Sequence, residues 1–455
     1  MNTHTTSRWS FACFGVAAAG LICMAPAWAG DFERAYRAAL DNDAKYRSDK
    51  FALASGQQAA PLALAGLLPQ VSANISETLV SGSQTTDLAS GGSSSTSLDY
   101  RAPSQSISLR APLINLEARA RYRQANAQVN ASEANFVARK AALVERLATV
   151  YLQRMLAEDS FASLQAQLRA VLGQRDLMRK RFERGEGTKT EVAEARGNLS
   201  LVTSQWVDSK DQMENARQAL MVVTGQSLES IARLQTEFTP PPLVPVPLEA
   251  WQAMARRANP DVAARKFAVD VAEAGVARSN AGHLPRLDLV ASASSSRNES
   301  VSSLNQAVNQ HSIGVQLSIP IFSGGAVKAG VTQAVAEQSR AEADLLAELR
   351  ALDLEVARLF QIIQTGNSKL LAYQDVLEAS QIALDGTQKG QTSGLRTNAD
   401  VLEAVRKVYQ AQRDLAQARY DHIFQRVKLY NKAGMEPDAV VAAIDALLNP
   451  AGTTP

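Results

Sequence analysis

Residues 311–325 read HSIGVQLSIPIFSGG, an alternating stretch that ends in a pair of glycines. Apolar side chains occupy every second position: Ile313, Val315, Leu317 and Ile319. This period of two is typical of a strand with one apolar and one polar face. After the glycines the apolar residues recur at steps of four and three from Leu345 to Ile363, which is the pattern of a coiled-coil helix. The stretch therefore predicts a strand over 311–321 that leads straight into a long helix over 326–391.

The same order of features is written twice in the chain. Leu109-x-x-Pro112-Leu113 recurs as Leu317-x-x-Pro320-Ile321, and Gly66-x-Leu68-Pro69 recurs as Gly282-x-Leu284-Pro285. Further along, Glu191-Val192-x-Glu194-Ala195 recurs as Asp400-Val401-x-Glu403-Ala404. Three ordered matches at nearly constant offset indicate an internal duplication.

The duplication divides the chain into two copies joined by a proline-rich linker. The first copy, 30–238, is predicted to hold a helix over 32–66, strands over 70–80 and 104–113, a long helix over 117–184 and a helix over 190–224. The linker is 239–247. The second copy, 248–434, is predicted to hold a helix over 248–282, strands over 286–294 and 311–321, a long helix over 326–391 and a helix over 398–432. Residues 81–97 and 294–310 are predicted to be polar loops, and 435–455 a C-terminal tail.

The fold class predicted is mainly α with a small β part. Each long helix would reach about 100 Å at about 1.5 Å per residue. The two shorter helices of a copy together equal one long helix in length, so we expect them to be stacked end to end beside it.

The N-terminus has the pattern of a secretory signal. A short apolar stretch from Phe11 to Met24 precedes Ala27-Trp28-Ala29, a small-x-small cleavage pattern, so residues 1–29 are predicted to be removed. Both cysteines, Cys13 and Cys23, lie inside that segment. Disulfides and thiol chemistry are therefore excluded for the mature chain. An uncleaved anchor is the alternative interpretation.

Charge and hydropathy limit the classes of function. Lys plus Arg is 47 and Asp plus Glu is 45, and this balance argues against nucleic acid as a partner. No later stretch approaches 18 continuous apolar residues, so no transmembrane helix is predicted. Four strands cannot close a membrane barrel, since closed barrels need about eight. If the strands lie in a membrane, copies of the chain must share them, and two, three or four copies remain open on this argument.

The duplicated layout, the prolines before both long helices and the turns Gly187 to Val192 and Gly394 to Leu402 resemble the TolC family of outer-membrane efflux and secretion channels. The resemblance covers nearly all of the mature chain. It implies a homotrimer in the outer membrane with a twelve-stranded barrel, continued into the periplasm by a twelve-helix tunnel. It also implies a periplasmic adaptor protein and an inner-membrane transporter as partners. The exported cargo would be small toxic molecules or unfolded polypeptides.

No catalytic set, cofactor site or metal site is predicted, because His4, His283, His311 and His422 are scattered. The turns between helices are better candidates. Asp400 and Glu403 lie three apart at a predicted helix start, and ordinary N-terminal acid preference is the alternative interpretation of that spacing.

The resemblance assigns these turns to a closed periplasmic gate. Arg396 would bond to Thr190 and Glu191 of the other turn, while Asp400 and Glu403 would form acidic rings around the lumen. Glu191 stands where the family has Asp, and Gln391 stands where the family often has Tyr.

Two other classes of function remain as alternatives. A soluble periplasmic coiled-coil adaptor or scaffold would explain export and the heptads but not the four alternating strands. An exported hydrolase has the least support, because no nucleophile and base pair is visible.

Overall fold

The computed structural model describes residues 30–87, 91–228, 231, 234, 238–298 and 306–448. The predicted signal peptide, 1–29, lies outside the described residues. In chain order the elements are α1 (Asp31–Asn42), α2 (Ala44–Gln57), α3 (Ala59–Ala65), β1 (Gln70–Asp87), β2 (Ser93–Asn115), α4 (Leu116–Glu183), α5 (Lys189–Thr224), α6 (Leu248–Ala258), α7 (Pro260–Ala281), β3 (Arg286–Asn298), β4 (Gln306–Ser318), α8 (Ala326–Thr392), α9 (Asn398–Lys432) and α10 (Pro437–Leu448).

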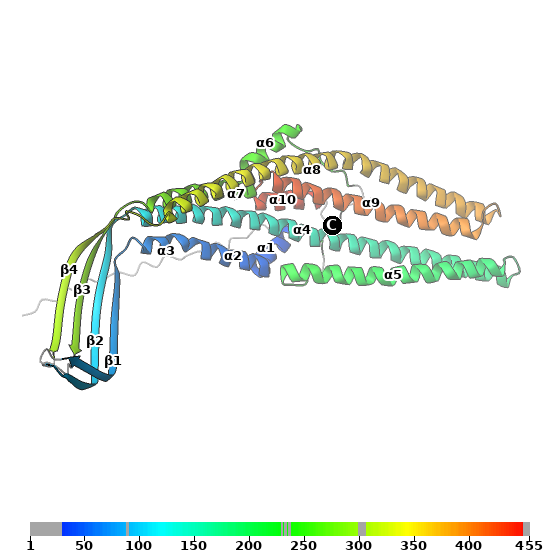
Figure 1. The fold of residues 1–455 in the computed structure, drawn as a ribbon. Helices are drawn as coiled ribbons and strands as arrows, with labels where there is room; N and C mark the ends of the chain where they lie inside the picture. The colour runs from blue at the N-terminus through cyan, green and yellow to red at the C-terminus, as the bar shows by residue number, and fades with distance from the viewer. Residues whose placement is uncertain are drawn as a thin grey trace, which may run out of the picture.

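The molecule is long and thin, with the strands at one end and two helical hairpins at the other (Figure 1). The hairpins are α4 with α5 and α8 with α9, and their turns lie far from the sheet. The predicted fold class is confirmed: the chain is mainly helical with a small β part. Among the residues described, no helix combines the length and apolar character that crossing a bilayer requires.

Local signals set the starts of the long helices. Asn115 caps α4, because its side-chain Oδ1 accepts a hydrogen bond from Ala118 N at 2.9 Å. Gly324 and Gly325 precede α8 with φ of 60° and 83°, a left-handed conformation that favours glycine. With 68 residues in α4 and 67 in α8, each long helix spans about 100 Å.

The shorter helices meet end to end at the middle of the molecule, once in each copy. Gly225, at the end of α5, lies against the side chain of Asn42, where α1 ends. At the end of α9, the carbonyl of Lys432 accepts a hydrogen bond at 3.0 Å from the amide of Asn259, where α6 ends. Each long helix is thus accompanied along its length by two shorter ones.

The prediction of unbroken helices over 32–66 and 248–282 is wrong. Asp43 and Asn259 are extended and cap the helices that follow them, so the backbone turns there. Asp43 accepts from Tyr46 N, while Asn259 accepts from Asp261 N and Val262 N. Pro260 also disfavours a helical conformation at Asn259. The breaks at Asp43 and Asn259 lie where the C-terminal ends of α5 and α9 meet α1 and α6.

The four strands form one antiparallel sheet in the order β1-β2-β3-β4. The strands are longer than predicted: β1 and β2 remain paired out to Asp87 and Ser93, so the loop predicted over 81–97 is largely strand. Ser and Thr side chains tolerate such a ladder because backbone hydrogen bonds, not apolar burial, hold it. In the second copy β3 reaches Asn298, and β4 runs from Gln306 to Ser318 rather than over 311–321. Pro320 lacks the N–H that a longer ladder would need.

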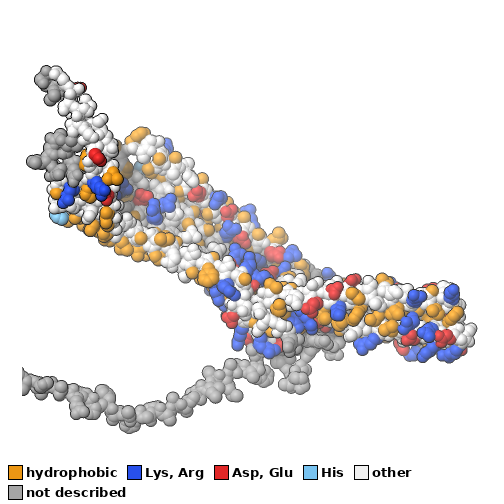
Figure 2. Space-filling view, turned by 90° about the horizontal axis from the view of Figure 1, so that it is seen from below, with side chains coloured by type: hydrophobic (Ala, Val, Ile, Leu, Met, Phe, Trp, Pro, Cys, Tyr) orange, Lys and Arg blue, Asp and Glu red, His pale blue; other side chains and the backbone are white. Residues whose placement is uncertain are grey.

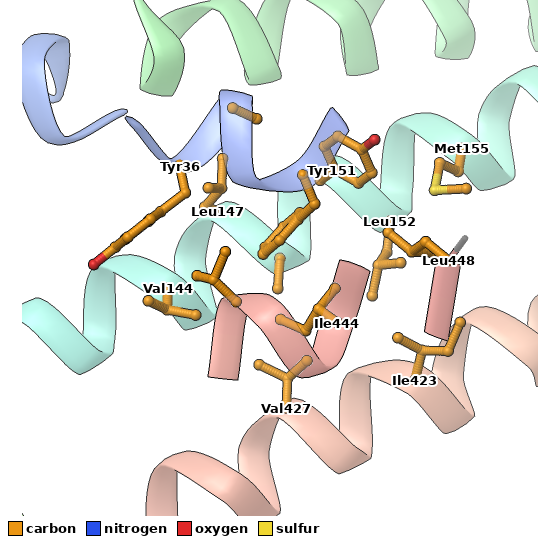
Figure 3. Packing of buried hydrophobic residues seen from close by; sticks show 14 of the residues in the cluster. Tyr36, Val144, Leu147, Tyr151, Leu152, Met155, Ile423, Val427, Ile444 and Leu448 are labelled. Carbon is orange, nitrogen blue, oxygen red and sulfur yellow. The ribbon is translucent and has the colours of Figure 1, made fainter. Parts of the chain in front are cut away.

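The largest apolar core lies where α1, α4, α9 and α10 meet (Figure 3). Tyr151 and Leu147 of α4 face Ile444 of α10 and Val427 of α9 in this cluster. The prediction of a plain tail over 435–455 is wrong for its first part, since α10 buries most of its apolar residues there. Five apolar residues of α10 recur at helical spacing and pack against α1, α4 and α9 in this core: Val440, Val441, Ile444, Leu447 and Leu448.

Candidate functional sites at the two ends of the protomer

The sheet has one apolar and one polar face, because residues opposite each other on antiparallel strands share a face. The apolar face carries Val71, Ala73, Ile75, Ile107, Leu109, Ala111, Leu287, Leu289, Ala291, Ala293, His311, Ile313, Val315 and Leu317. Much of it is open to solvent in the protomer, with Ile75 80% and Ile313 79% exposed. A soluble sheet normally buries such a face. An exposed apolar face of this width suits contact with lipid.

The polar face carries hydroxyl and amide side chains with little charge. Its residues are Gln70, Ser72, Asn74, Ser76, Ser104, Ser106, Ser108, Arg110, Asp288, Val290, Ser292, Ser294, Ser296, Gln310, Ser312, Gly314 and Gln316. The hydroxyls of Ser72 and Ser108 are 2.8 Å apart. Such a face is compatible with water, and Figure 2 shows fewer charged side chains over the strand part than over the helices.

One ion pair stands on this polar face near the helical end of the sheet. The Arg110 Nε atom donates to Asp288 Oδ2 at 3.0 Å, and its Nη2 atom is 2.8 Å from the same oxygen. Asp288 is buried while Arg110 is about half exposed. The pair bridges β2 and β3 beside the register shift between Pro112 and Ile114. It therefore supports the ladder where a proline and a bulge weaken it.

Both outer edges of the sheet, on β1 and β4, have no strand beside them among the residues described. A long unpaired edge offers its backbone N–H and C=O groups to another strand. In lipid each unpaired group costs several kcal/mol, so an open sheet of this kind needs neighbours on both sides. Because both edges are unpaired and the apolar face is exposed, the sheet is incomplete in a single protomer.

At the opposite end, the turn between α4 and α5 is closed by a capping box. The Thr188 hydroxyl accepts from Glu191 N at 3.2 Å, while the Glu191 carboxylate accepts from Thr188 N at 2.8 Å. Thr190 is exposed in the first turn of α5. The carboxylate of Glu191 is thus engaged within its own turn.

The turn between α8 and α9 repeats this arrangement. The Thr397 hydroxyl accepts from Asp400 N at 3.2 Å, and Asp400 accepts from Thr397 N at 2.9 Å. The backbone N–H of Thr397 is the main cause that lowers the pKa of Asp400. Glu403 lies one turn later and accepts from Arg406 Nε at 2.9 Å and Nη2 at 2.7 Å, which lowers the pKa of Glu403. Both carboxylates are ionised at neutral pH.

The two halves of the predicted gate are not joined within one protomer. Arg396 is exposed, and its side chain lies over Gly390 at the end of α8. Among the ion pairs that the described residues form, none joins Arg396 to Glu191. The contact of Arg396 with Thr190 and Glu191 stays a prediction.

Sequence reasoning missed a buried carboxamide cluster that connects the two hairpins near their tips. We use this name for Gln174 of α4, Gln391 of α8 and Asn398 of α9. The Gln174 Nε2 atom donates to Asn398 Oδ1 at 2.8 Å and to Gln391 Oε1 at 3.2 Å. Asn398 is 1% and Gln391 6% exposed. Gln391 thus has a structural partner across the hairpins, at the position where the family resemblance leads one to expect Tyr.

The histidines are not brought together. His311 lies within β4, and His283 is in the turn before β3. His422 is buried in α9, where its Nε2 atom accepts from Arg426 Nε at 3.0 Å, and burial lowers its pKa to about 4. Within the described part of the chain, no three His, Cys, Asp or Glu side chains are grouped as a metal site would require.

Comparison with known proteins places these features in a family. The sequence profile of the "Outer membrane efflux protein" family matches residues 35–226 and 251–435. The chain is 30% identical over 413 residues to the alkaline protease secretion protein AprF of Pseudomonas aeruginosa, covering 90% of this chain and 86% of that protein. It is 31% identical over 407 residues to the proteases secretion protein PrtF of Dickeya chrysanthemi, covering 88% and 87%. It is 28% identical over 325 residues to the outer membrane protein TolC of Vibrio cholerae, covering 71% and 74%.

The fold is also that of a solved channel. The crystal structure of the Campylobacter jejuni CmeC outer membrane channel superposes with a TM-score of 0.76, covering 92% of this chain and 90% of that chain. At 16% identity this likeness concerns the fold alone.

Proposed function

Because this chain belongs to the outer membrane efflux protein family, we propose that it is the outer-membrane exit duct of a type I secretion system. It would pass polypeptides from an inner-membrane transporter, through a periplasmic adaptor, to the outside. The single observation that carries the proposal is the two-faced sheet with free edges, which is incomplete until copies of the chain surround a lumen. The resemblance to the TolC family is confirmed, and the hypothesis of a soluble periplasmic adaptor is wrong.

In the proposed assembly, three protomers contribute four strands each to one closed barrel of twelve. The apolar face would contact the hydrocarbon of the outer membrane, and the Ser-rich polar face would line the lumen. Each protomer would add its long helices to a tunnel reaching about 100 Å into the periplasm. Closure pairs the edge of β4 with β1 of the next copy and removes every unpaired edge. This arrangement assigns no catalysis to the chain.

Polypeptide cargo is favoured over small molecules by similarity. The two relatives at 30% and 31% identity are secretion proteins for proteases, and each is covered over more than four fifths of its length. The neutral lumen face also suits an extended chain of any sequence, because hydroxyl and amide groups neither trap nor repel one sign of charge. Small-molecule efflux is the second candidate, supported by the family profile.

The helical tips would form the periplasmic gate. Three copies of Asp400 and Glu403 around one axis would make acidic rings that attract cations and repel anions. Arg396 would add a salt-sensitive contact to Thr190 and Glu191, and the buried carboxamide cluster would hold the two hairpins of each protomer together. Docking of the adaptor and transporter would offset the cost of separating them.

The test removes the gene from its host and compares two readouts, the proteins in the culture medium and the tolerance to toxic small molecules. Loss of particular polypeptides from the medium with unchanged tolerance is the expected result. If tolerance falls and the proteins in the medium are unchanged, the function is efflux of small molecules rather than secretion. If neither readout changes, the proposal that the chain is an exit duct is wrong.

Complementation separates the two faces of the sheet. Ile313→Asp puts a charge on the face assigned to lipid and is expected to abolish rescue, because such a charge destabilises every copy, by less than the about 2–4 kcal/mol that Arg or Lys costs at mid-bilayer. Ser312→Asp, the next residue along β4, puts the same charge on the face assigned to the lumen and is expected to retain assembly. Equal behaviour of the two variants would contradict the assignment of the faces.

A further inference from the structure

The first described residue, Gly30, lies in contact with a carboxylate from the far end of the chain. A Cβ atom added to Gly30 would be 2.2 Å from Oδ1 and 2.6 Å from Oδ2 of Asp445 in α10. No side chain fits in that space without moving the carboxylate. Position 30 therefore accepts glycine because another residue occupies the place of its side chain.

Asp445 caps α1 in place of the missing side chain. Its Oδ1 accepts from Phe32 N at 3.2 Å and its Oδ2 accepts from Glu33 N at 2.9 Å. These N–H groups are the ones that a capping residue at position 30 would bind. The neighbouring residues Phe32 and Ile444 are fully buried in the same core, so the contact joins α1 to α10 firmly.

The surroundings of Asp445 are acidic. Asp31 and Glu33 flank it, and their own partners are Arg34 and Arg37 on the exposed side of α1. Among the ion pairs that the described residues form, none involves Asp445. Burial raises the pKa of Asp445, against the two backbone N–H groups, which lower it. A cation beside this carboxylate would stabilise it.

The predicted cleavage site before Gly30 would supply such a cation as a new N-terminus. The cleavage pattern Ala27-Trp28-Ala29 ends one residue before Gly30. Hydrolysis by an endopeptidase of the export machinery breaks the peptide bond between Ala29 and Gly30. Water provides the hydroxyl of the new Ala29 carboxyl group and a proton to the released amine, which becomes an α-ammonium group at neutral pH. Because the N and Cβ atoms of one residue lie about 2.5 Å apart, that nitrogen is within about 5 Å of Asp445 Oδ1.

We propose that signal-peptide removal creates an ion pair between the α-ammonium group of Gly30 and the carboxylate of Asp445. The processed N-terminus then joins α1 to α10 and closes the chain's two ends into the main core. In the unprocessed chain the same nitrogen is a neutral amide, and the carboxylate only caps the helix. Cleavage thus adds a contact that stabilises the mature protomer and not its precursor.

The test uses the detergent-extracted mature protein. Intact-mass measurement establishes the first residue, and an amine-reactive ester then labels the α-amine at a series of pH values, with labelling followed by mass spectrometry of the N-terminal peptide. Only the uncharged amine attacks the ester, forming an amide and releasing the ester's leaving group. An ion pair that raises the amine pKa by about one unit slows labelling about 10-fold at neutral pH.

Asp445→Asn is expected to remove that protection while its remaining side-chain oxygen still caps α1. Asp438→Asn is the matched control, since Asp438 is exposed on the same helix and pairs with Lys140 at 3.2 Å. It is expected to label like the wild type. If Asp445→Asn does not fold, the wild type alone decides: its labelling midpoint is expected at higher pH when folded than in urea. A mature chain that begins at another residue would overturn the proposal, as would equal labelling of folded and unfolded protein or of the wild type and Asp445→Asn.

Discussion

Replacing Gln174 by Leu is the sharpest test of how the two hairpins are held together at their tips. Gln174 is the only donor in the buried carboxamide cluster that the structure shows reaching both partners, Asn398 at 2.8 Å and Gln391 at 3.2 Å. Leucine keeps most of the side-chain volume and removes the donor. The carboxamide oxygens of Asn398 and Gln391 then stay buried without this hydrogen bond.

The magnitude follows from the two bonds. Each contributes about 1 kcal/mol net, so the loss is about 2 kcal/mol per protomer before any added cost of an unpaired buried oxygen. Separation of the hairpins exposes these oxygens to water, which restores their hydrogen bonds. If the three protomers of the proposed trimer move together, about 6 kcal/mol shifts the balance of closed and open tips by a factor on the order of 10⁴.

Single-channel recording in planar bilayers measures this shift. Gln174→Leu is expected to raise the conductance and the open fraction without loss of the assembled protein. Gln333→Leu is the matched control, because Gln333 is exposed and donates to Glu337 in its own helix at 3.0 Å. A Gln174→Leu channel that assembles and conducts like the wild type would refute the role of the cluster as a restraint.

Two further predictions concern the charged residues of the tips. Arg396→Glu is expected to raise the conductance by a smaller factor than Gln174→Leu, since Arg396 is exposed and its ion pairs are weak. Raising KCl from about 0.1 to about 1 M screens the contact and should bring the conductance of the wild type toward that of the variant. An Arg396→Glu channel with wild-type conductance at low salt would exclude the Arg396 contact. Cation selectivity is expected to persist from pH 7 to about pH 5 and to fall below about pH 4, because the pKa values of Asp400 and Glu403 are lowered from the ordinary range of a carboxyl group, about 4. These groups lose their charge only as the pH falls through the lowered values. Reversal potentials measure the selectivity, and the double variant Asp400→Asn/Glu403→Gln is expected to show no such acid transition.

The long helices and the sheet could be predicted because their signals are local and repeated. The alternation around Ile313 and the spacing from Leu345 to Ile363 each extend over many residues, and the duplication provides a second copy of both. The helix break at Asn259 also has a local signal, because the following Pro260 disfavours a helical conformation at Asn259. The helix over 437–448 also has a local signal, apolar residues at helical spacing after a proline.

The strand ends could not be predicted from composition. Residues 81–87 are rich in Ser, Thr and Gly, which are typical of loops, and they form a strand only because β2 is long enough to pair with them. The features of the candidate site at the tips also differ in whether the sequence predicts them. Both capping boxes follow from the spacing of Thr188 to Glu191 and of Thr397 to Asp400. The carboxamide cluster joins residues more than 200 positions apart, and no periodicity points to it.

The distribution of buried apolar residues differs between the middle of the protomer and the tips, in a way that favours the tips as the place of the proposed gate. The main core binds α1, α4, α9 and α10 at mid-length and includes large, fully buried side chains such as Tyr151 and Ile423. Near the tips, the cluster that connects the hairpins has five buried residues, Val171, Val202, Val401, Leu402 and Val405. Each buries only a small aliphatic side chain, and full burial is worth about 1.5–3 kcal/mol apiece. The hairpin tips therefore bury fewer and smaller apolar side chains than the main core, and polar contacts such as those of Gln174 make a larger share of what holds them together.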